Sequence, residues 1–161
     1  MINSKNSFIQ LIQHPVKFRW FLLTKLPSAF FSGLRVQAID SSKAVVTVPY
    51  QWFSKNPFKS TYFACLAMAA ELSTGLLAMM NTYQSHPSIS MLVTGLEAKY
   101  FKKATGVTSF LCEDGESFHR TVLDAIATGE GRVFTAKSVG KNEAGELVAE
   151  FLITWSFKAK K

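Results

Sequence analysis

One carboxylate stands in the middle of the most apolar stretch of this sequence. The stretch runs from Tyr62 to Met80, and its only ionisable groups are Glu71, the Tyr62 phenol and the Cys65 thiol. Burying an unpaired polar group costs roughly 2–7 kcal/mol, and an unpaired charge costs more. A chain that keeps Glu71 there must pair it, protonate it or use it. Desolvation would raise its pKa, which suits a general base near neutral pH, while a nucleophile is the other reactive role.

The side chains around this acid each allow two interpretations. Glu71 itself can be a structural acid bonded to backbone or to a second subunit. Asn56 can orient a carbonyl group or hold the loop before the apolar stretch. Tyr62 can donate a hydrogen bond or pack as a core aromatic residue. Ser73 and Thr74 lie within one turn of Glu71 and can hold a water molecule, although such residues more often bond back to their own helix.

Other kinds of chemistry lack their usual signals. The three histidines, His14, His86 and His119, have no metal-ligand spacing, so we expect no metal site. The sequence shows neither a glycine-rich phosphate loop nor a Gly-x-Ser-x-Gly elbow. We therefore expect no bound cofactor and no Ser-His-Asp hydrolase.

The elements that must position these residues follow from the hydrophobic pattern. Helices are predicted over three ranges: 4–13, 15–26 and 60–82. Ser60 or Thr61 is the expected N-cap of the third helix. Strands are predicted as a hairpin over 34–48 and then over four ranges: 89–102, 106–113, 131–141 and 146–158. Residues 116–127 fit either a short helix or an irregular strand. One apolar helix among antiparallel strands indicates an α+β fold.

Composition limits the functional classes. The chain has 161 residues, enough for one domain, and 48% of them are hydrophobic. Its 14 phenylalanines indicate an aromatic core or a ligand tunnel, and its net charge of +7 indicates an anionic partner. No cleavable signal peptide is evident, and a central Glu71 argues against a membrane-spanning helix. We expect a cytoplasmic protein in which Cys65 and Cys112 stay reduced.

The order of elements and one spacing resemble the hot-dog thioesterases of the phenylacetate-pathway type. Many of these have an Asn, a His-Gly-Gly six residues later and an acid fifteen residues after the Asn. Here Asn56, Tyr62-Phe63-Ala64 and Glu71 stand at those positions. The segment from Leu96 to Gly106 is similar to the strand and turn of the family. The likeness covers about residues 33–158 and is closest to a thioesterase-like branch in which His-Gly-Gly is often degraded.

The resemblance implies a fold and an activity. The fold would be a hot-dog domain over 32–161, in which a curved antiparallel sheet wraps the central helix, with an N-terminal helical extension over 1–31. The activity would be hydrolysis of acyl-CoA: N–H groups at the helix start polarise the thioester carbonyl, and Glu71 activates water, with Asn56 and Tyr62 assisting. The alternative is a non-catalytic hot-dog module that binds an acyl chain or lipid. Phe and Ala in place of Gly-Gly narrow the approach of the thioester.

The resemblance also implies contacts and partners. Substrate contacts are expected from the following residues: Phe63, Ala64, Ser73, Thr74, Lys99, Lys102 and Lys103. The three lysines would hold the phosphates of coenzyme A, which enters only as part of the substrate, or would form a solvated basic edge. We expect a homodimer or a dimer of dimers, with no nucleic-acid partner. Residues 5–31 would either contact an anionic membrane surface or pack as a lid over the sheet.

Overall fold

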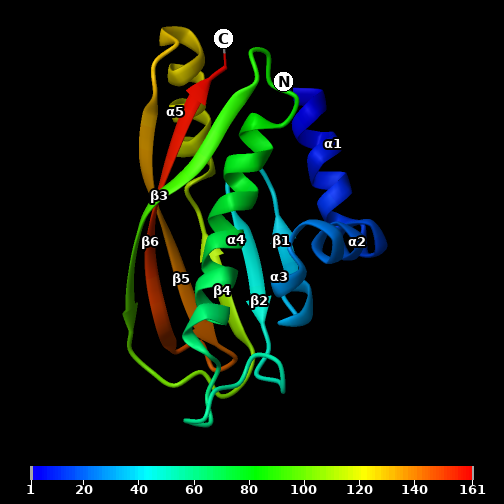
Figure 1. Cartoon of the computed structure of the whole chain (residues 1–161), viewed down its shortest axis with the longest axis vertical. Helices are drawn as coiled ribbons and strands as arrows, with labels where there is room; N and C mark the ends of the chain where they lie inside the picture. Colours follow the sequence, from blue (N-terminus) through cyan, green and yellow to red (C-terminus); the bar gives the residue numbers. More distant parts are fainter. Residues whose placement is uncertain (1, 161) are drawn as a thin grey trace.

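A curved antiparallel sheet wraps around one long helix in the computed structural model, which describes residues 2–160 (Figure 1). The helices are α1 (Ile2–Gln13), α2 (Pro15–Lys25), α3 (Pro27–Phe31), α4 (Phe63–Thr82) and α5 (Gly115–Thr128). The strands are β1 (Arg35–Ile39), β2 (Ala44–Val48), β3 (Ile89–Tyr100), β4 (Thr108–Cys112), β5 (Arg132–Asn142) and β6 (Leu147–Ala159). The predicted α+β arrangement is confirmed. The domain boundary at residues 31 and 32 stays a prediction, and its outer ends, Met1 and Lys161, lie outside the described residues.

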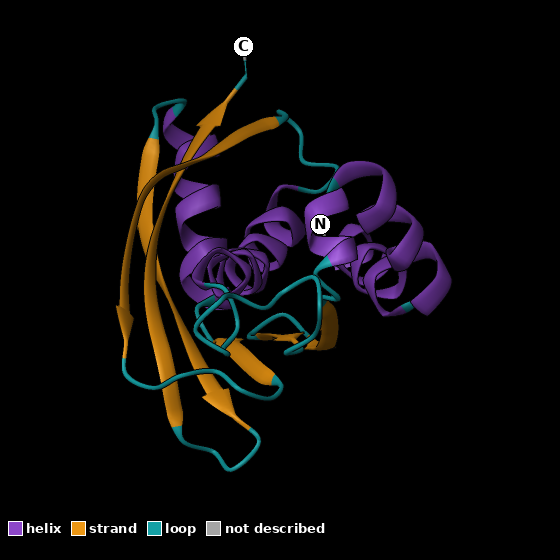
Figure 2. Ribbon diagram, turned by 60° about the horizontal axis from the view of Figure 1, so that its bottom comes forward, coloured by secondary structure: helices purple, strands orange, loops and turns teal. Residues whose placement is uncertain are grey.

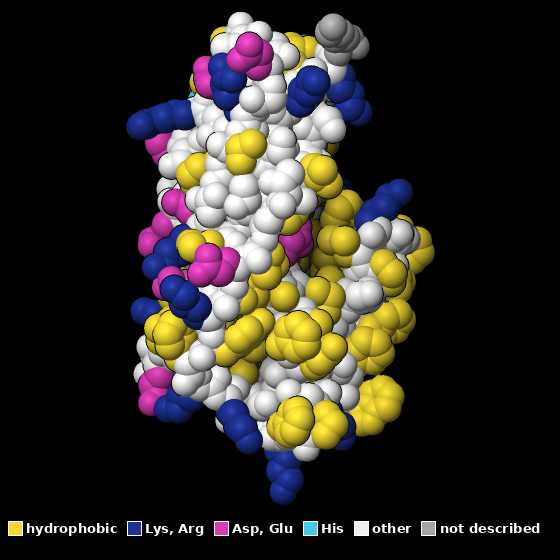
Figure 3. All heavy atoms as spheres, turned by 60° about the vertical axis from the view of Figure 1, so that its left-hand side comes forward, with side chains coloured by type: hydrophobic (Ala, Val, Ile, Leu, Met, Phe, Trp, Pro, Cys, Tyr) yellow, Lys and Arg dark blue, Asp and Glu magenta, His cyan; other side chains and the backbone are white. Residues whose placement is uncertain are grey.

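The six strands lie in the order β1-β2-β4-β5-β6-β3, and each neighbouring pair is antiparallel. Figure 2 shows how the strands curve around the helices. The strand predicted over 146–158 is confirmed as β6, and every second residue of it faces inward and is buried: Ala149, Phe151, Ile153, Trp155 and Phe157. β3 forms one edge and bonds only to β6 within the described chain. It leaves Leu92, Leu96 and Tyr100 exposed, and Figure 3 shows hydrophobic side chains gathered on this side of the molecule.

α4 lies in the concave face of the sheet and contacts four of its strands, β2, β4, β5 and β6. Alanine, leucine and methionine, which are strong helix formers, dominate its sequence. By length and composition it could cross a membrane, but 67% of its most apolar 18-residue window is buried inside the protein. Burial in this sheet therefore explains its hydrophobicity.

The predicted start of α4 at residue 60 is wrong. The N-cap is Tyr62, which makes no side-chain capping bond. Ser60 instead bonds to Asn56, and the Thr61 hydroxyl donates to the Ala104 carbonyl oxygen at 3.2 Å. Both hydroxyls are thus used to fix the preceding loop, which leaves the start of the helix open.

The N-terminal helices pack on the β1 side of the molecule. Phe8 and Ile12 of α1, and Phe18 and Leu22 of α2, are buried, as the lid interpretation expects. The prediction of two leading helices missed α3, a five-residue helix that begins at Pro27. Membrane contact through residues 5–31 stays a prediction.

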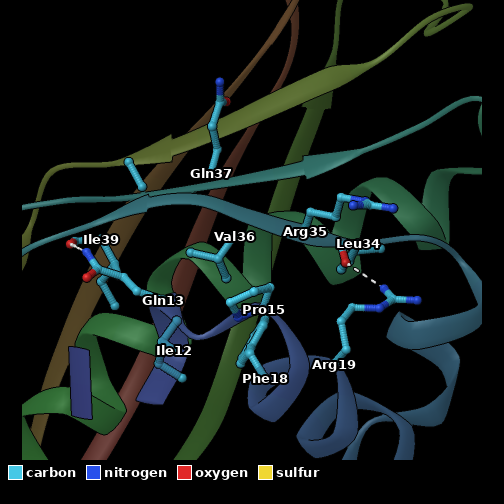
Figure 4. A pocket seen from close by; sticks show the side chains of 11 residues that line it. Ile12, Gln13, Pro15, Phe18, Arg19, Leu34, Arg35, Val36, Gln37 and Ile39 are labelled. Carbon is cyan, nitrogen blue, oxygen red and sulfur yellow. Dashed lines mark hydrogen bonds between the residues drawn. The ribbon is translucent and has the colours of Figure 1, made fainter. Parts of the chain in front are cut away.

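Two side chains from these helices reach the free edge of β1 (Figure 4). Gln13 donates a hydrogen bond to the Ile39 carbonyl oxygen at 3.4 Å. Arg19 donates to the Leu34 carbonyl oxygen, also at 3.4 Å, while its guanidinium lies 4.0 Å from the centre of the Phe30 ring. A cavity of about 220 Å³ remains between the helices and β1.

The segment between β4 and β5, for which the sequence allows a short helix or an irregular strand, is the helix α5. Phe118 of this helix contacts Phe134 and Phe157 of the sheet, with ring centres 5.1 and 6.0 Å apart. Such phenylalanines form much of the core.

Both cysteines, Cys65 and Cys112, are buried and free.

Candidate active site

The start of α4 opens onto a cavity of about 730 Å³. Its walls are the loop before α4 and the turn after β3, and five of the ten predicted site residues line it: Asn56, Tyr62, Phe63, Lys102 and Lys103. The first turn of a helix leaves its backbone N–H groups without intrahelical partners. The N–H groups of Phe63, which lines this cavity, and of the next residue, Ala64, have no intrahelical partner and carry the positive end of the helix dipole.

Asn56 is fully engaged in the loop. Its side-chain oxygen accepts hydrogen bonds from the N–H groups of Phe58 and Ser60 at 3.0 and 3.2 Å. Its side-chain nitrogen donates to the Ser60 hydroxyl at 3.1 Å and to the Thr61 carbonyl oxygen at 3.4 Å. This geometry favours the loop-holding role of Asn56, through which it positions the helix start.

Glu71 faces another cavity, of about 290 Å³, between α4 and the N-terminal helices. The other walls are Met68 and Leu72 of α4 and the junction of α2 with α3, from Lys25 to Ala29. Among the described residues, no hydrogen bond or ion pair reaches the Glu71 carboxylate. Burial raises the pKa of Glu71 above its usual value, with no opposing ion pair.

Gly75 makes room for this carboxylate one turn further along α4. A Cβ atom at Gly75 would lie 3.0 Å from Oε1 of Glu71 and 3.4 Å from the Trp155 ring. A larger residue would push the carboxylate or the indole ring aside. The absence of a side chain at Gly75 therefore leaves space for the Glu71 carboxylate on one side and the Trp155 ring on the other.

Ser73 and Thr74 lie on the sheet side of α4 and line neither cavity. The Ser73 hydroxyl is buried, donates to the Ala70 carbonyl oxygen at 2.7 Å and contacts the Ser138 hydroxyl at 2.8 Å. The Thr74 hydroxyl donates to the Glu71 carbonyl oxygen and accepts a hydrogen bond from the Trp155 indole at 3.0 Å. Their hydroxyls are therefore occupied in joining α4 to β5 and β6.

The three predicted lysines divide into two groups. Lys102 and Lys103 line the larger cavity, whereas Lys99 lies outside its lining and forms an exposed ion pair with Glu97 at 3.8 Å. Lys102 pairs with Glu146 at 2.6 Å, and this contact lowers the Glu146 pKa. Lys103 donates to the Phe58 carbonyl oxygen at 3.3 Å. The cavity rim is basic, as a phosphate-bearing ligand requires.

Sequence reasoning missed several residues that line the cavities. Tyr100 and Phe101 form the wall of the larger cavity at the end of β3. Their position next to the lysines of the same turn was a usable signal. Lys25 and Leu26 lie at the Glu71 cavity, but nothing in their sequence indicates that they meet α4.

The two reactive features lie apart within one chain. Glu71 is eight residues beyond Phe63, and at about 1.5 Å per residue their Cα atoms are separated by roughly 12 Å along the helix axis. A carbonyl group held at the helix start is therefore distant from the carboxylate of the same chain. Bringing them together requires a second copy or a substrate that spans both.

An antiparallel sheet that wraps around the long helix α4 is the hot-dog fold. Several solved structures have the same fold as this chain. A protein of unknown function from Pseudomonas aeruginosa, described as a probable thioesterase, is 20% identical, with a TM-score of 0.75 over 91% of this chain and 97% of that chain. A protein of unknown function from Chlorobaculum tepidum is 18% identical, with a TM-score of 0.76 over 90% and 94%. A thioesterase from Haemophilus influenzae is 12% identical, with a TM-score of 0.63 over 87% and 88%. These likenesses show the fold.

The family of the chain follows from its sequence. Residues 16–157 match the family described as a domain of unknown function, DUF4442, and the chain belongs to that family. The match begins in α2, so the family includes part of the helical extension as well as the sheet. The comparison with curated proteins gives no match.

Proposed function

We propose that this protein is an acyl thioester hydrolase that acts on acyl-CoA as a homodimer. The observation that carries the proposal is the Glu71 carboxylate, which has no partner within the described residues, faces a cavity and has a raised pKa. Such a group is suited to accept a proton from water near neutral pH. The thioesterase-like structures that share the fold support the same reaction class.

In the proposed reaction, the helix-start N–H groups of Phe63 and Ala64 polarise the thioester carbonyl. Glu71 takes a proton from water, whose oxygen attacks the carbonyl carbon. The carbon–sulfur bond then breaks, and the proton passes to the thiolate, giving a carboxylic acid and free coenzyme A. Lys102 and Lys103 hold the phosphates at the rim.

The homodimer follows from the separation of these groups. Because the helix start and Glu71 are about 12 Å apart along one helix, we propose that each site combines the helix start of one chain with Glu71 of the other. The free edge of β3 is suited to join the two sheets, since unpaired strand edges favour pairing.

A second candidate is a non-catalytic module that binds an acyl chain. Phe63 supports it, because a large exposed side chain stands where related enzymes keep glycine, and the adjoining cavity is mostly apolar. A panel of acyl-CoA substrates, assayed with the wild type and Glu71→Ala, separates the two. Turnover that disappears in the variant supports the hydrolase. Tight acyl-CoA binding by calorimetry, without turnover in either protein, supports the binding module.

A further inference from the structure

One end of the molecule exposes large aromatic side chains that the fold does not use. The loop between β2 and α4 carries Trp52, Phe53 and Phe58, and α3 ends beside it at Phe31; these four residues are named here the aromatic end. Trp52 is 77% exposed and Phe58 is 72% exposed. The rings of Phe31, Phe53 and Trp52 form a chain, with successive centres 5.7 and 6.2 Å apart. Exposed aromatic groups of this kind mark interaction sites.

The loop holds these rings outward through an ordered polar interior. Ser54 is buried, although its neighbour Phe53 is exposed; its hydroxyl donates to the Pro49 carbonyl oxygen at 2.6 Å and accepts from the Gln51 N–H at 3.0 Å. The Ser54 carbonyl oxygen accepts from the Tyr62 N–H at 2.7 Å. The loop therefore satisfies its polar groups inside and presents its apolar groups to solvent, the reverse of an ordinary surface loop.

Lysines surround the aromatic end. Lys55, Lys59 and Lys103 are exposed and, within the described residues, form no ion pair. Lys59 has a φ of 57°, a left-handed conformation that is unfavourable for a lysine. Two acids lie nearby on the turn between β5 and β6: Glu146 is paired with Lys102, and Glu143 lies against Gly106. Figure 3 shows hydrophobic and basic side chains side by side at its lower end.

We propose that the aromatic end docks on an anionic lipid bilayer. Trp52 and Phe58 would enter the interfacial region, where aromatic rings are favoured, while Lys55, Lys59 and Lys103 would lie against the lipid phosphates. Positive charge beside exposed aromatic rings fits this surface better than it fits a second copy of the same basic chain, because two such ends would repel each other. The docking stands whether or not the protein hydrolyses thioesters.

The docked orientation would place the larger cavity at the membrane. Phe58, Lys55 and Lys103 belong both to the lipid-facing surface and to the lining of that cavity. A lipid or acyl chain leaving the bilayer would meet the start of α4 first. Exposed apolar side chains also occur elsewhere, at Val16 and Trp20 on α2 and at Leu92 and Leu96 on β3.

Vesicle binding tests the proposal with the full chain and no substrate. Phosphatidylcholine vesicles with about one third phosphatidylglycerol should sediment the protein, and pure phosphatidylcholine vesicles should bind it much less. A Lys55→Gln/Lys59→Gln/Lys103→Gln variant should lower the partition coefficient by on the order of 10²-fold, and the matching triple Arg variant should keep it. Trp52→Ser/Phe58→Ser should weaken binding by about tenfold or more. Both residues are exposed, so this variant should fold normally.

Fluorescence locates the docking surface. In a Trp20→Phe background, brominated lipids should quench the emission of Trp52, because Trp155, the other tryptophan, is only 4% exposed. Adding Trp52→Phe should abolish the quenching. Equal binding to both kinds of vesicle would overturn the proposal. Quenching that depends on Trp20 instead would assign docking to α2, and a Trp52→Ser/Phe58→Ser variant that loses self-association but not vesicle binding would assign the aromatic end to a second copy.

Discussion

The two edges of the sheet differ in how they are finished. The edge at β1 is five residues long and is closed by side chains from the N-terminal helices, with Gln13 and Arg19 bonded to carbonyl oxygens at its two ends. The edge at β3 is twelve residues long and, within the described chain, has no covering helix along its free side. Exposed strand edges favour pairing with another strand, and proteins commonly cover them.

This difference assigns distinct tasks to the two sides. The β1 side buries Phe18 and Leu22 and contributes packing. The β3 side borders the larger cavity through Tyr100 and the turn that follows it, so the open edge and the candidate site belong together. We therefore expect changes in the packing of the β1 side to alter stability and changes at β3 to alter assembly, while turnover should also depend on Glu71, which faces the α2–α3 junction.

The largest expected effect is on turnover after a change at Glu71 itself. Glu71→Gln keeps the side-chain volume but removes the base, and losing a general base costs roughly 10²–10⁴ in rate. Steady-state hydrolysis of acyl-CoA measures the effect, and thermal unfolding checks the fold. Gln13→Ala at the covered edge is the control and should keep full turnover. Unchanged turnover in Glu71→Gln would remove Glu71 from the mechanism.

Stability should respond most on the covered side. Phe18 lies on the buried face of α2 and is 4% exposed, and replacing such a phenylalanine with alanine costs about 3–5 kcal/mol. Phe18→Ala should lower the free energy of unfolding by that amount in a denaturant titration while leaving the association state unchanged. A change in association state with little loss of stability would mean that the N-terminal helices, and not β3, form the interface.

Assembly should respond at the open edge. Leu92→Lys/Leu96→Lys places two charges on β3, and lysines on an edge strand oppose pairing. Sedimentation should show a monomer, and turnover should fall on the order of 10²-fold, because a displaced catalytic group costs about that much. Val133→Lys, which changes an exposed apolar residue of the interior strand β5, is the matched control. An active monomer would show that one chain is sufficient.

A smaller effect should appear in the pH dependence of stability. The pKa of Glu71 is raised from 4.5 by burial, so the folded protein binds its proton more tightly than the unfolded chain does. Stability from this group is full below the unfolded pKa and is lost as the pH rises through the folded pKa. Glu71→Gln should therefore gain stability relative to the wild type as the pH rises above about 4.5, measured by denaturant titrations. A difference that does not vary with pH would mean that Glu71 is solvated.

Much of the fold could be predicted because its signals are local. The residues of β6 alternate between apolar and polar, and those of α4 form a long apolar run. Both patterns lie within one continuous stretch of sequence, so both elements could be predicted. The start of α4 was misplaced because Ser60 and Thr61 are good capping residues whose hydroxyls bond to the loop and to Ala104 instead. Such long-range partners leave no periodic pattern in the sequence.

The candidate site was less predictable for the same reason. Spacing identified Glu71 and the helix start, but it also included Ser73 and Thr74, whose hydroxyls join α4 to the sheet. Ser73 is two residues from Glu71 and so lies on another face of the helix. Thr74 is three residues away, as a neighbour of Glu71 would be, but its hydroxyl accepts a hydrogen bond from Trp155, a partner 81 residues further along the chain. The wall near Lys25 depends on tertiary packing alone.

The smallest expected effect separates the lysines at the end of β3. Lys102 and Lys103 line the larger cavity, so replacing both with alanine should raise KM for acyl-CoA by roughly two- to tenfold, the range expected for exposed ionic contacts. The change should affect kcat much less, because the phosphates are bound equally in the ground state and the transition state. A short thioester without the nucleotide should show little change in KM. Lys99→Ala is the matched control, because Lys99 pairs with Glu97 outside the cavity.

Salt provides an independent measure of the same contacts. With a Debye length of about 8–10 Å at 0.10–0.15 M salt, exposed phosphate contacts are screened, so KM of the wild type for acyl-CoA should rise with added salt. The Lys102→Ala/Lys103→Ala variant should respond less, and Lys99→Ala should respond as the wild type does. If Lys99→Ala raises KM as much as the double variant, the whole strand end acts as a diffuse basic edge. A flat salt response in the wild type would mean that the carrier binds away from β3, and the open edge would then serve assembly alone.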